Sequence, residues 1–139
     1  MTPLPTHEPF EMIIRVQPGD IDEMGHVNNV IYLRWVQEVA TAHWYAAATA
    51  EQKASLLWVV ARHEIDYLRP AMPNQDLVLR TWVGPAGGRH FTRHVEILRQ
   101  TDGKPLARAL SHWVPVDVET KRPVKAGPDV YAMFSREEE

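Results

Sequence analysis

The hydrophobic positions of this chain change their spacing several times, and each change predicts a different element. Residues 10–17, FEMIIRVQ, are rich in β-prone side chains and end at the turn residues Pro18 and Gly19, which predicts a strand. From Val27 the apolar side chains recur every three or four residues through an alanine-rich segment, which predicts a helix of about five turns. The apolar stripe is wide, so we expect this helix to be covered on several sides.

After residue 55 the apolar positions recur every two residues, which predicts strands. Residues 56–70 should form one, with five apolar side chains on one face: Leu57, Val59, Ala61, Ile65 and Tyr67. Further strands are expected over residues 76–84, 89–100 and 105–118. Asp102-Gly103, between the last two, is the strongest short hairpin signal in the chain. The segment GPDVYAMF can add one helical turn.

One strand, one long helix and four strands joined by short turns predict an α+β arrangement, in which an antiparallel five-stranded sheet carries the helix on one face. An open sheet leaves edge strands exposed, so edge-to-edge dimerisation is expected. A chain of 139 residues suits one domain. We expect it to cover residues 1–139, with 1–9 and 135–139 as loose termini.

Composition and charge narrow the class of protein. With 45% hydrophobic and 24% charged residues, the chain has the composition of a soluble domain. Its net charge of −3 gives no case for a nucleic-acid partner. The absence of cysteine excludes disulfides and a cysteine nucleophile. No apolar run approaches the roughly 18 residues of a membrane span, and no secretory signal is evident. We therefore expect a cytoplasmic protein without a membrane partner.

The histidines and glycines do not suggest a metal or cofactor site. His63, His90, His94 and His112 fall on three separate predicted strands, and the spacing of His90 and His94 places them about 13 Å apart. The chain has no Gly-x-Ser-x-Gly nucleophile elbow and no glycine-rich phosphate loop. We expect no metal and no cofactor.

Polar residues gather just before the predicted helix: Asp20, Asp22, His26, Asn28 and Asn29. A helix N-terminus offers free backbone N–H groups and a partial positive charge. A carboxylate beside it could attack a carbonyl group or activate a water molecule. The same residue types also serve as ordinary loop and capping residues. Both interpretations remain open on these residues alone.

Three segments, in order, resemble a known family. They are Asp20-Ile21-Asp22 with Gly25-His26-Val27-Asn28-Asn29 and Tyr32; EIDYLRPA, residues 64–71; and the hairpin DGKPLARALSHWVPVD, which ends at Asp117. Together they resemble the acyl-CoA thioesterases of the 4-hydroxybenzoyl-CoA thioesterase-like group over residues 10–125. The resemblance implies a hotdog fold, in which a curved antiparallel five-stranded sheet wraps around one long central helix.

The resemblance also implies an activity and a site. The activity is hydrolysis of an acyl-CoA to a free carboxylic acid and coenzyme A, which is part of the substrate. Asp22 matches the catalytic carboxylate, as nucleophile or general base, and a backbone N–H near Asn29 matches the carbonyl-polarising amide. The candidate catalytic residues are Asp22, His26 and Asn29. The candidate substrate-binding residues are Asn28, Tyr32, Val60, Arg62 and Arg89.

Several of these roles have a structural alternative. His26 could donate to the carbonyl, exchange protons or hold the loop, and Asn28 and Asn29 could simply cap the helix. Tyr32 could pack in the core, line an acyl pocket or do both. In the family the pocket lies between two subunits, so residues 58–65 of a partner should face the catalytic carboxylate. Arg62 and Arg89 are the candidates for the phosphates of coenzyme A.

Other functions remain as alternatives. Plant acyl-carrier-protein thioesterases carry an asparagine where this chain has Met24, and one hotdog branch uses a helical glutamate, for which Glu38 is the candidate. The histidine-bearing helix pattern of hotdog dehydratases is missing. A catalytically silent binder of acyl-CoA or acyl carrier protein, or a structural oligomer, could use the same fold. The resemblance implies a homodimer or homotetramer.

Overall fold

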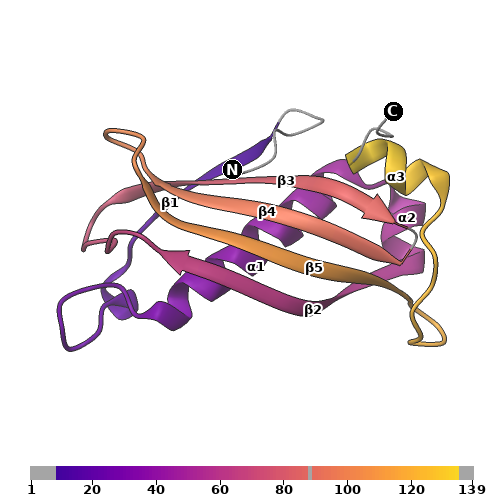
Figure 1. The fold of residues 1–139 in the computed structure, drawn as a ribbon, viewed down its shortest axis with the longest axis horizontal. Helices are drawn as coiled ribbons and strands as arrows, with labels where there is room; N and C mark the ends of the chain where they lie inside the picture. Colours follow the sequence, from indigo (N-terminus) through magenta and orange to yellow (C-terminus); the bar gives the residue numbers. More distant parts are fainter. Residues whose placement is uncertain (1–8, 88, 135–139) are drawn as a thin grey trace.

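The computed structural model describes residues 9–87 and 89–134. Along the chain the elements are β1 (Phe10–Arg15), the 3-10 helix η1 (Pro18–Asp20), α1 (Asn29–Ala47), α2 (Ala50–Ser55), β2 (Leu56–Tyr67), β3 (Asp76–Gly87), β4 (His90–Arg99), β5 (Pro105–Asp117) and α3 (Pro128–Phe134). The sheet is antiparallel with strand order β1-β3-β4-β5-β2. Figure 1 shows α1 running diagonally behind this sheet. The predicted α+β hotdog arrangement is confirmed.

Local signals explain where the helices begin and end. The side chain of Asn28 accepts a hydrogen bond from the backbone N–H of Val30 and caps α1, two residues later than the periodicity predicted. At Ala48 the backbone becomes extended, and a capping box between Thr49 and Gln52 starts α2. The periodicity predicts one helix that continues through the alanine-rich segment to Ala50 and no separate α2, because a six-residue helix shows little periodicity of its own.

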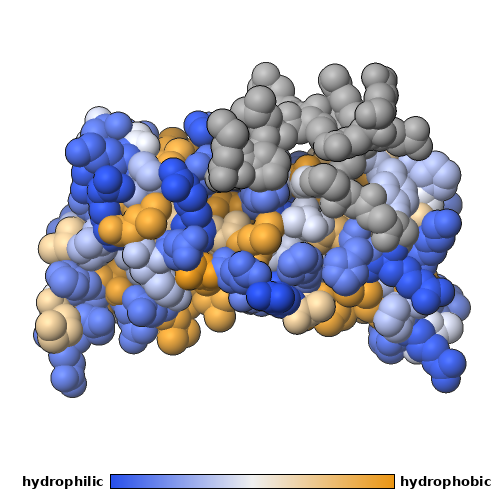
Figure 2. Space-filling view, in the orientation of Figure 1, coloured by the Kyte–Doolittle hydropathy of each residue, from blue (hydrophilic) through white to orange (hydrophobic). Residues whose placement is uncertain are grey.

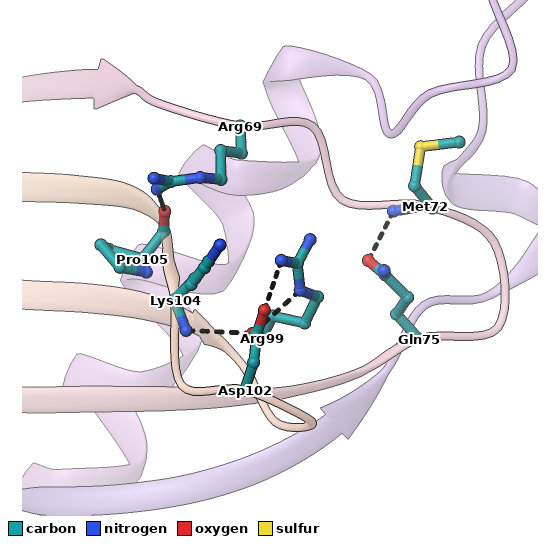
Figure 3. A network of polar contacts seen from close by, with 7 residues as sticks. All are labelled: Arg69, Met72, Gln75, Arg99, Asp102, Lys104 and Pro105. Atoms are coloured by element: carbon teal, nitrogen blue, oxygen red, sulfur yellow. Dashed lines mark hydrogen bonds and ion pairs between the residues drawn. The ribbon is translucent and has the colours of Figure 1, made fainter.

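Polar side chains hold the β4–β5 hairpin and the neighbouring loop at one end of the sheet (Figure 3). Gly103 adopts a φ of 72°, the left-handed conformation that such a turn requires. Arg99 donates to the carboxylate of Asp102 at 2.6 and 3.0 Å, which holds the pKa of Asp102 below its usual range. Arg69 donates to the carbonyl oxygen of Pro105 at 2.8 Å. The predicted hairpin is confirmed.

The prediction of which side chains of β2 point inward was wrong for the first half of the strand. A bulge between Val60 and Arg62 adds one residue to β2 relative to β5 and reverses which side chains face the helix. Trp58 therefore packs against Trp44 of α1, while Leu57 and Val59 are 42% and 52% exposed. Beyond the bulge, two of the predicted side chains do turn inward: Ile65 packs against the main core, and the ring of Tyr67 meets that of Tyr32.

The core lies between the sheet and α1. Buried side chains of α1 meet inward-facing side chains of β3, β4 and β5, including Trp35, Val36, Val39, Leu79, Val95 and Ile97. A second apolar cluster surrounds Trp44 and joins the last turns of α1 to α3. None of the described helices is both long and apolar enough to cross a membrane. The loose termini were predicted at residues 1–9 and 135–139. Of these, residues 1–8 and 135–139 lie outside the described residues.

Candidate active site

A small hairpin loop positions the polar cluster at the start of α1. Ile21 and Val27 form an isolated antiparallel bridge, and the backbone N–H of Asp22 donates to the carbonyl oxygen of His26 at 2.8 Å. The N–H of Gly25 returns to the carbonyl oxygen of Asp22 at 3.0 Å and closes the turn. These bonds fix Asp22 relative to the first helical turn.

Gly25 is required by the shape of this turn. Its φ of 79° is a conformation that side chains with a Cβ rarely adopt, although open space surrounds it. We expect Gly25→Ala to lower the free energy of unfolding by about 1 kcal/mol, because the left-handed backbone becomes strained. The measurement is denaturant unfolding. Gly19→Ala is the matched control, because Gly19 has equal space and no positive φ. The free energy of unfolding of this variant should stay within about 0.5 kcal/mol of the wild-type value. Equal losses in both variants would contradict the argument.

The carboxylate of Asp22 is half-buried and is oriented by the loop. Its Oδ1 accepts from the backbone N–H of Met24 at 2.9 Å and, more weakly, from that of His26 at 3.4 Å. Its Oδ2 accepts no hydrogen bond from the described residues. One oxygen therefore anchors the group, while the other is available to a water molecule or a substrate. The loop-bracing and the chemical interpretations of Asp22 are compatible.

The N-terminus of α1 presents a backbone donor beside this loop. The N–H of Asn28 donates to the carbonyl oxygen of Asp20 at 2.9 Å, and that of Val30 donates to the side chain of Asn28 at 3.1 Å. Between them, the N–H of Asn29 has no acceptor among the described residues. Asn28 is thus the N-cap. The N–H of Asn29 can polarise a carbonyl group, with the partial positive charge of the helix behind it.

Asp20 and Glu38 are both occupied by ion pairing. Asp20 is only 5% exposed, and its carboxylate accepts from the N–H of Gln17 at 2.9 Å and from Arg34 at 3.1 Å. Arg34 also pairs with Glu38 at 3.2 Å, four residues further along α1. Asp20 therefore braces the loop against the helix. The carboxylate of Glu38 is half-exposed and is balanced by the same arginine.

Tyr32 supports the site from the core side. It is 3% exposed, and its hydroxyl oxygen accepts from the backbone N–H of Ala71 at 2.8 Å; burial raises its pKa. Its ring packs edge-on against Trp35 and Tyr67. The hydroxyl of Tyr67 in turn donates to the carbonyl oxygen of Asn29 at 3.4 Å. The end of β2 therefore lies beside the start of α1, whereas a direct role of Tyr32 in substrate binding stays a prediction.

The remaining predicted residues do not gather at this loop within one protomer. The His26 side chain is exposed, and its imidazole forms no hydrogen bond with the described residues. Val60 and Arg62 lie on β2 beside the bulge, where Arg62 pairs with Glu64 at 2.7 Å. Arg89 is exposed in the turn between β3 and β4, at the end of the sheet away from the β4–β5 hairpin (Figure 1). Their substrate-binding roles stay predictions.

The sequence interpretation missed a cavity of about 370 Å³. Side chains of α1, α2, β2, β3, β4, β5 and α3 line it. They include Thr41, Trp44, Trp58, Phe91, Arg93 and Trp113. One sequence signal was present. Arg93 alternates with Thr92 and His94 and shares the inward-facing positions of Phe91 and Val95, where an unpaired charge is unusual.

The curved sheet around one helix, with a carboxylate loop leading into that helix, is the architecture of the hotdog thioesterase class. The chain belongs to the thioesterase-like superfamily, whose family model matches residues 16–134. A structure of a thioesterase superfamily protein from Jannaschia sp. CCS1 has a TM-score of 0.85 at 21% identity, covering 96% of this chain and 95% of that one.

Two named relatives are similar in sequence. The long-chain acyl-CoA thioesterase FadM of Escherichia coli is 25% identical over 114 residues, which cover 78% of this chain and 84% of FadM. The chloroplastic oleoyl-acyl carrier protein thioesterase 1 of Arabidopsis thaliana is 32% identical over 98 residues, covering 68% of this chain and 27% of that protein. The chain also covers 46% of two uncharacterised Mycobacterium tuberculosis proteins.

Proposed function

We propose that the protein hydrolyses an acyl-CoA thioester to a free carboxylic acid and coenzyme A. The observation that carries this proposal is the arrangement at the start of α1, where the Asp22 carboxylate and the unoccupied N–H of Asn29 are held by one small hairpin. Membership of the thioesterase-like superfamily supports it. The expected cytoplasmic location, the absence of a cofactor and the role of His26 stay predictions.

The chemistry assigned to these groups is acyl transfer to water. The N–H of Asn29 donates to the thioester carbonyl oxygen and stabilises the negative charge that develops there. As general base, Asp22 takes a proton from the attacking water molecule; as nucleophile, it forms an acyl anhydride that water then cleaves. Either way the C–S bond breaks, and the coenzyme A thiolate leaves and takes up a proton. The products are the carboxylic acid and the thiol.

We further propose that each site combines two protomers. At about 1.5 Å per residue, the α1 axis runs about 22 Å from Asn29 to Trp44 in the cavity wall, so the cavity and the loop lie far apart in one protomer. The outer edge of β2 has no partner strand among the described residues. The space-filling view shows hydrophobic surface along the β2 side of the molecule, at the bottom of the view (Figure 2). Leu57 and Val59 are exposed on this strand.

Antiparallel pairing of two β2 edges about a twofold axis would bring the two halves of the site together. The start of β2 lines the cavity, and its end contacts the start of α1 through Tyr67. In such a dimer the start of one β2 lies beside the end of the other. Asp22 of the partner subunit then lies near the cavity of this protomer.

The test of the proposed function is thiol release from short, long and aromatic acyl-CoA thioesters. A thiol-reactive dye suits the assay, because a protein without cysteine adds no background. Release above the uncatalysed rate is the expected result. Binding of acyl-CoA without release would instead identify a silent acyl-CoA binder, and neither release nor binding would identify a structural oligomer.

A further inference from the structure

The cavity combines apolar walls with one buried positive charge. Trp44, Trp58, Phe91 and Trp113 supply large aromatic surfaces, as expected of a site that takes up hydrocarbon. Arg93 also lines it, yet this side chain is only 6% exposed. A buried cation in such a wall needs a physical explanation.

The hydrogen-bond partners of Arg93 among the described residues are a histidine and a hydroxyl group, not a carboxylate. Its Nη1 donates to Nδ1 of His43 at 2.9 Å and to the hydroxyl of Thr81 at 3.1 Å. Because a guanidinium can only donate, Nδ1 of His43 accepts, which places the histidine proton on Nε2. The guanidinium carbon lies 5.5 Å from the ring centroid of Phe134, within cation–π range. These contacts hold the side chain in position without balancing its charge.

No carboxylate of the described residues pairs with Arg93, whereas the arginines that do form ion pairs are at least a quarter exposed. Burial lowers the pKa of Arg93 to about 10, which still leaves it protonated at neutral pH. A buried charge without a counter-charge is costly, and a ligand that supplies the counter-charge recovers that cost on binding.

Other polar groups also line the cavity. Thr41 and Tyr45 add hydroxyl groups, and the ammonium group of Lys53 donates to the carbonyl oxygen of Tyr45 at 3.4 Å. The indole N–H groups of Trp58 and Trp113 are buried and have no acceptor among the described residues. Both tryptophans line the cavity. These two N–H groups have almost no accessible surface, so the buried guanidinium is the feature that points to a ligand: a buried cation within apolar walls favours a ligand with a hydrocarbon body and one anionic end.

We propose that the cavity selects acyl groups that carry a carboxylate at the end remote from the thioester, with Arg93 as the residue that binds this carboxylate. The substrates are then the coenzyme A half-thioesters of dicarboxylic acids. This inference rests on the proposed function and adds the substrate class. One guanidinium balances one carboxylate, and the aromatic walls contact the methylenes between the two ends.

The test compares substrate pairs of equal length that differ only in the distal carboxylate, such as adipyl-CoA and hexanoyl-CoA or suberyl-CoA and octanoyl-CoA. We expect the wild type to favour the carboxylated member of at least one pair by a factor on the order of 10² in kcat/KM, because the alternative leaves a buried charge unpaired. Arg93→Met should reverse that ratio, whereas Arg93→Lys should keep part of it. Equal loss on both members would indicate a structural role and overturn the proposal.

Three controls complete the design. Arg108→Met is the matched control: Arg108 lies on β5 and pairs with Glu96, so the ratio should not change. If Arg93→Met does not fold, calorimetry gives the affinities of Asp22→Asn for adipyl-CoA and hexanoyl-CoA. Tighter binding of adipyl-CoA is the expected result, and equal affinities would overturn the proposal. A chain ending at Phe134 removes Glu137–Glu139, which lie outside the described residues. A preference seen only in this shortened chain would mean that the tail balances Arg93, and it would overturn the proposal.

The outcomes also separate this inference from the proposed function. Hydrolysis of hexanoyl-CoA and octanoyl-CoA as fast as their carboxylated partners would overturn the inference and leave the thioesterase proposal intact. Tight binding of the carboxylated thioesters by the wild type, without thiol release, would overturn the thioesterase proposal and leave the inference about the carboxylate intact.

Discussion

Asp22→Asn is expected to lower kcat/KM for thiol release by a factor on the order of 10³ or more, because an amide can neither attack the thioester carbon nor accept a proton from water. The fold should be kept. The Asn side-chain oxygen can still accept from the backbone N–H groups of Met24 and His26, which are the contacts that orient the wild-type carboxylate. Thiol release with the preferred substrate, measured beside a thermal unfolding curve, checks both expectations.

The neighbouring carboxylate provides the matched control. Glu23 is exposed in the same turn, and its side chain forms no hydrogen bond or ion pair with the described residues, so Glu23→Gln should leave the rate close to the wild-type value. Undiminished release by Asp22→Asn would move the carboxylate role elsewhere. Glu38 would then be the next candidate, and Glu38→Gln the next variant, although its carboxylate already pairs with Arg34 at 3.2 Å.

The second large effect is recovery of activity in a mixed dimer. Asp22→Asn removes the carboxylate, and Thr41→Trp, at an exposed position of α1 in the cavity wall, fills the cavity. Each homodimer should be inactive. In a dimer with one protomer of each kind, Asp22 of one subunit meets the open cavity of the other, so one of the two sites is intact. We expect about half of the wild-type rate per dimer.

Co-expression with two affinity tags isolates this mixed dimer, and thiol release measures it. A protomer that carries both changes, paired with a wild-type protomer, is the control. It also leaves one fully intact carboxylate and one intact cavity, but on the same protomer, so a shared site predicts no activity. Activity in the control and none in the mixed dimer would place each complete site within one protomer. Inactivity of both would refute either arrangement of the cavity and the loop.

The part of the site that comes from one continuous stretch could be predicted from the sequence. Asp22, Gly25, Asn28 and Asn29 are close along the chain, and the turn and cap that they form depend on local preferences of the backbone. The start of α1 was therefore misplaced by only two residues. The capping role of Asn28 follows from the same local chemistry.

The parts that depend on distant contacts could not be predicted in this way. The β2 bulge changes the faces of Trp58 and Val59 without any break in the alternating pattern, because a bulge is defined only by the strand opposite it. The cavity likewise joins α1, β2, β4 and β5, and the hydrogen bonds of Arg93 involve His43 and Thr81 from two other elements.

The sequence by itself determined the order of the five strands and the long helix, the antiparallel sheet that carries this helix, and the loop that presents Asp22 beside the start of α1. Periodicity, turn residues and caps are local properties, and they act on the backbone wherever the segment lies. The tertiary structure alone decided where space remains between the packed elements and which charge faces it. Those outcomes depend on how side chains from separate elements fill a common volume, since a buried charge such as Arg93 is defined by its neighbours in space rather than by its neighbours along the chain.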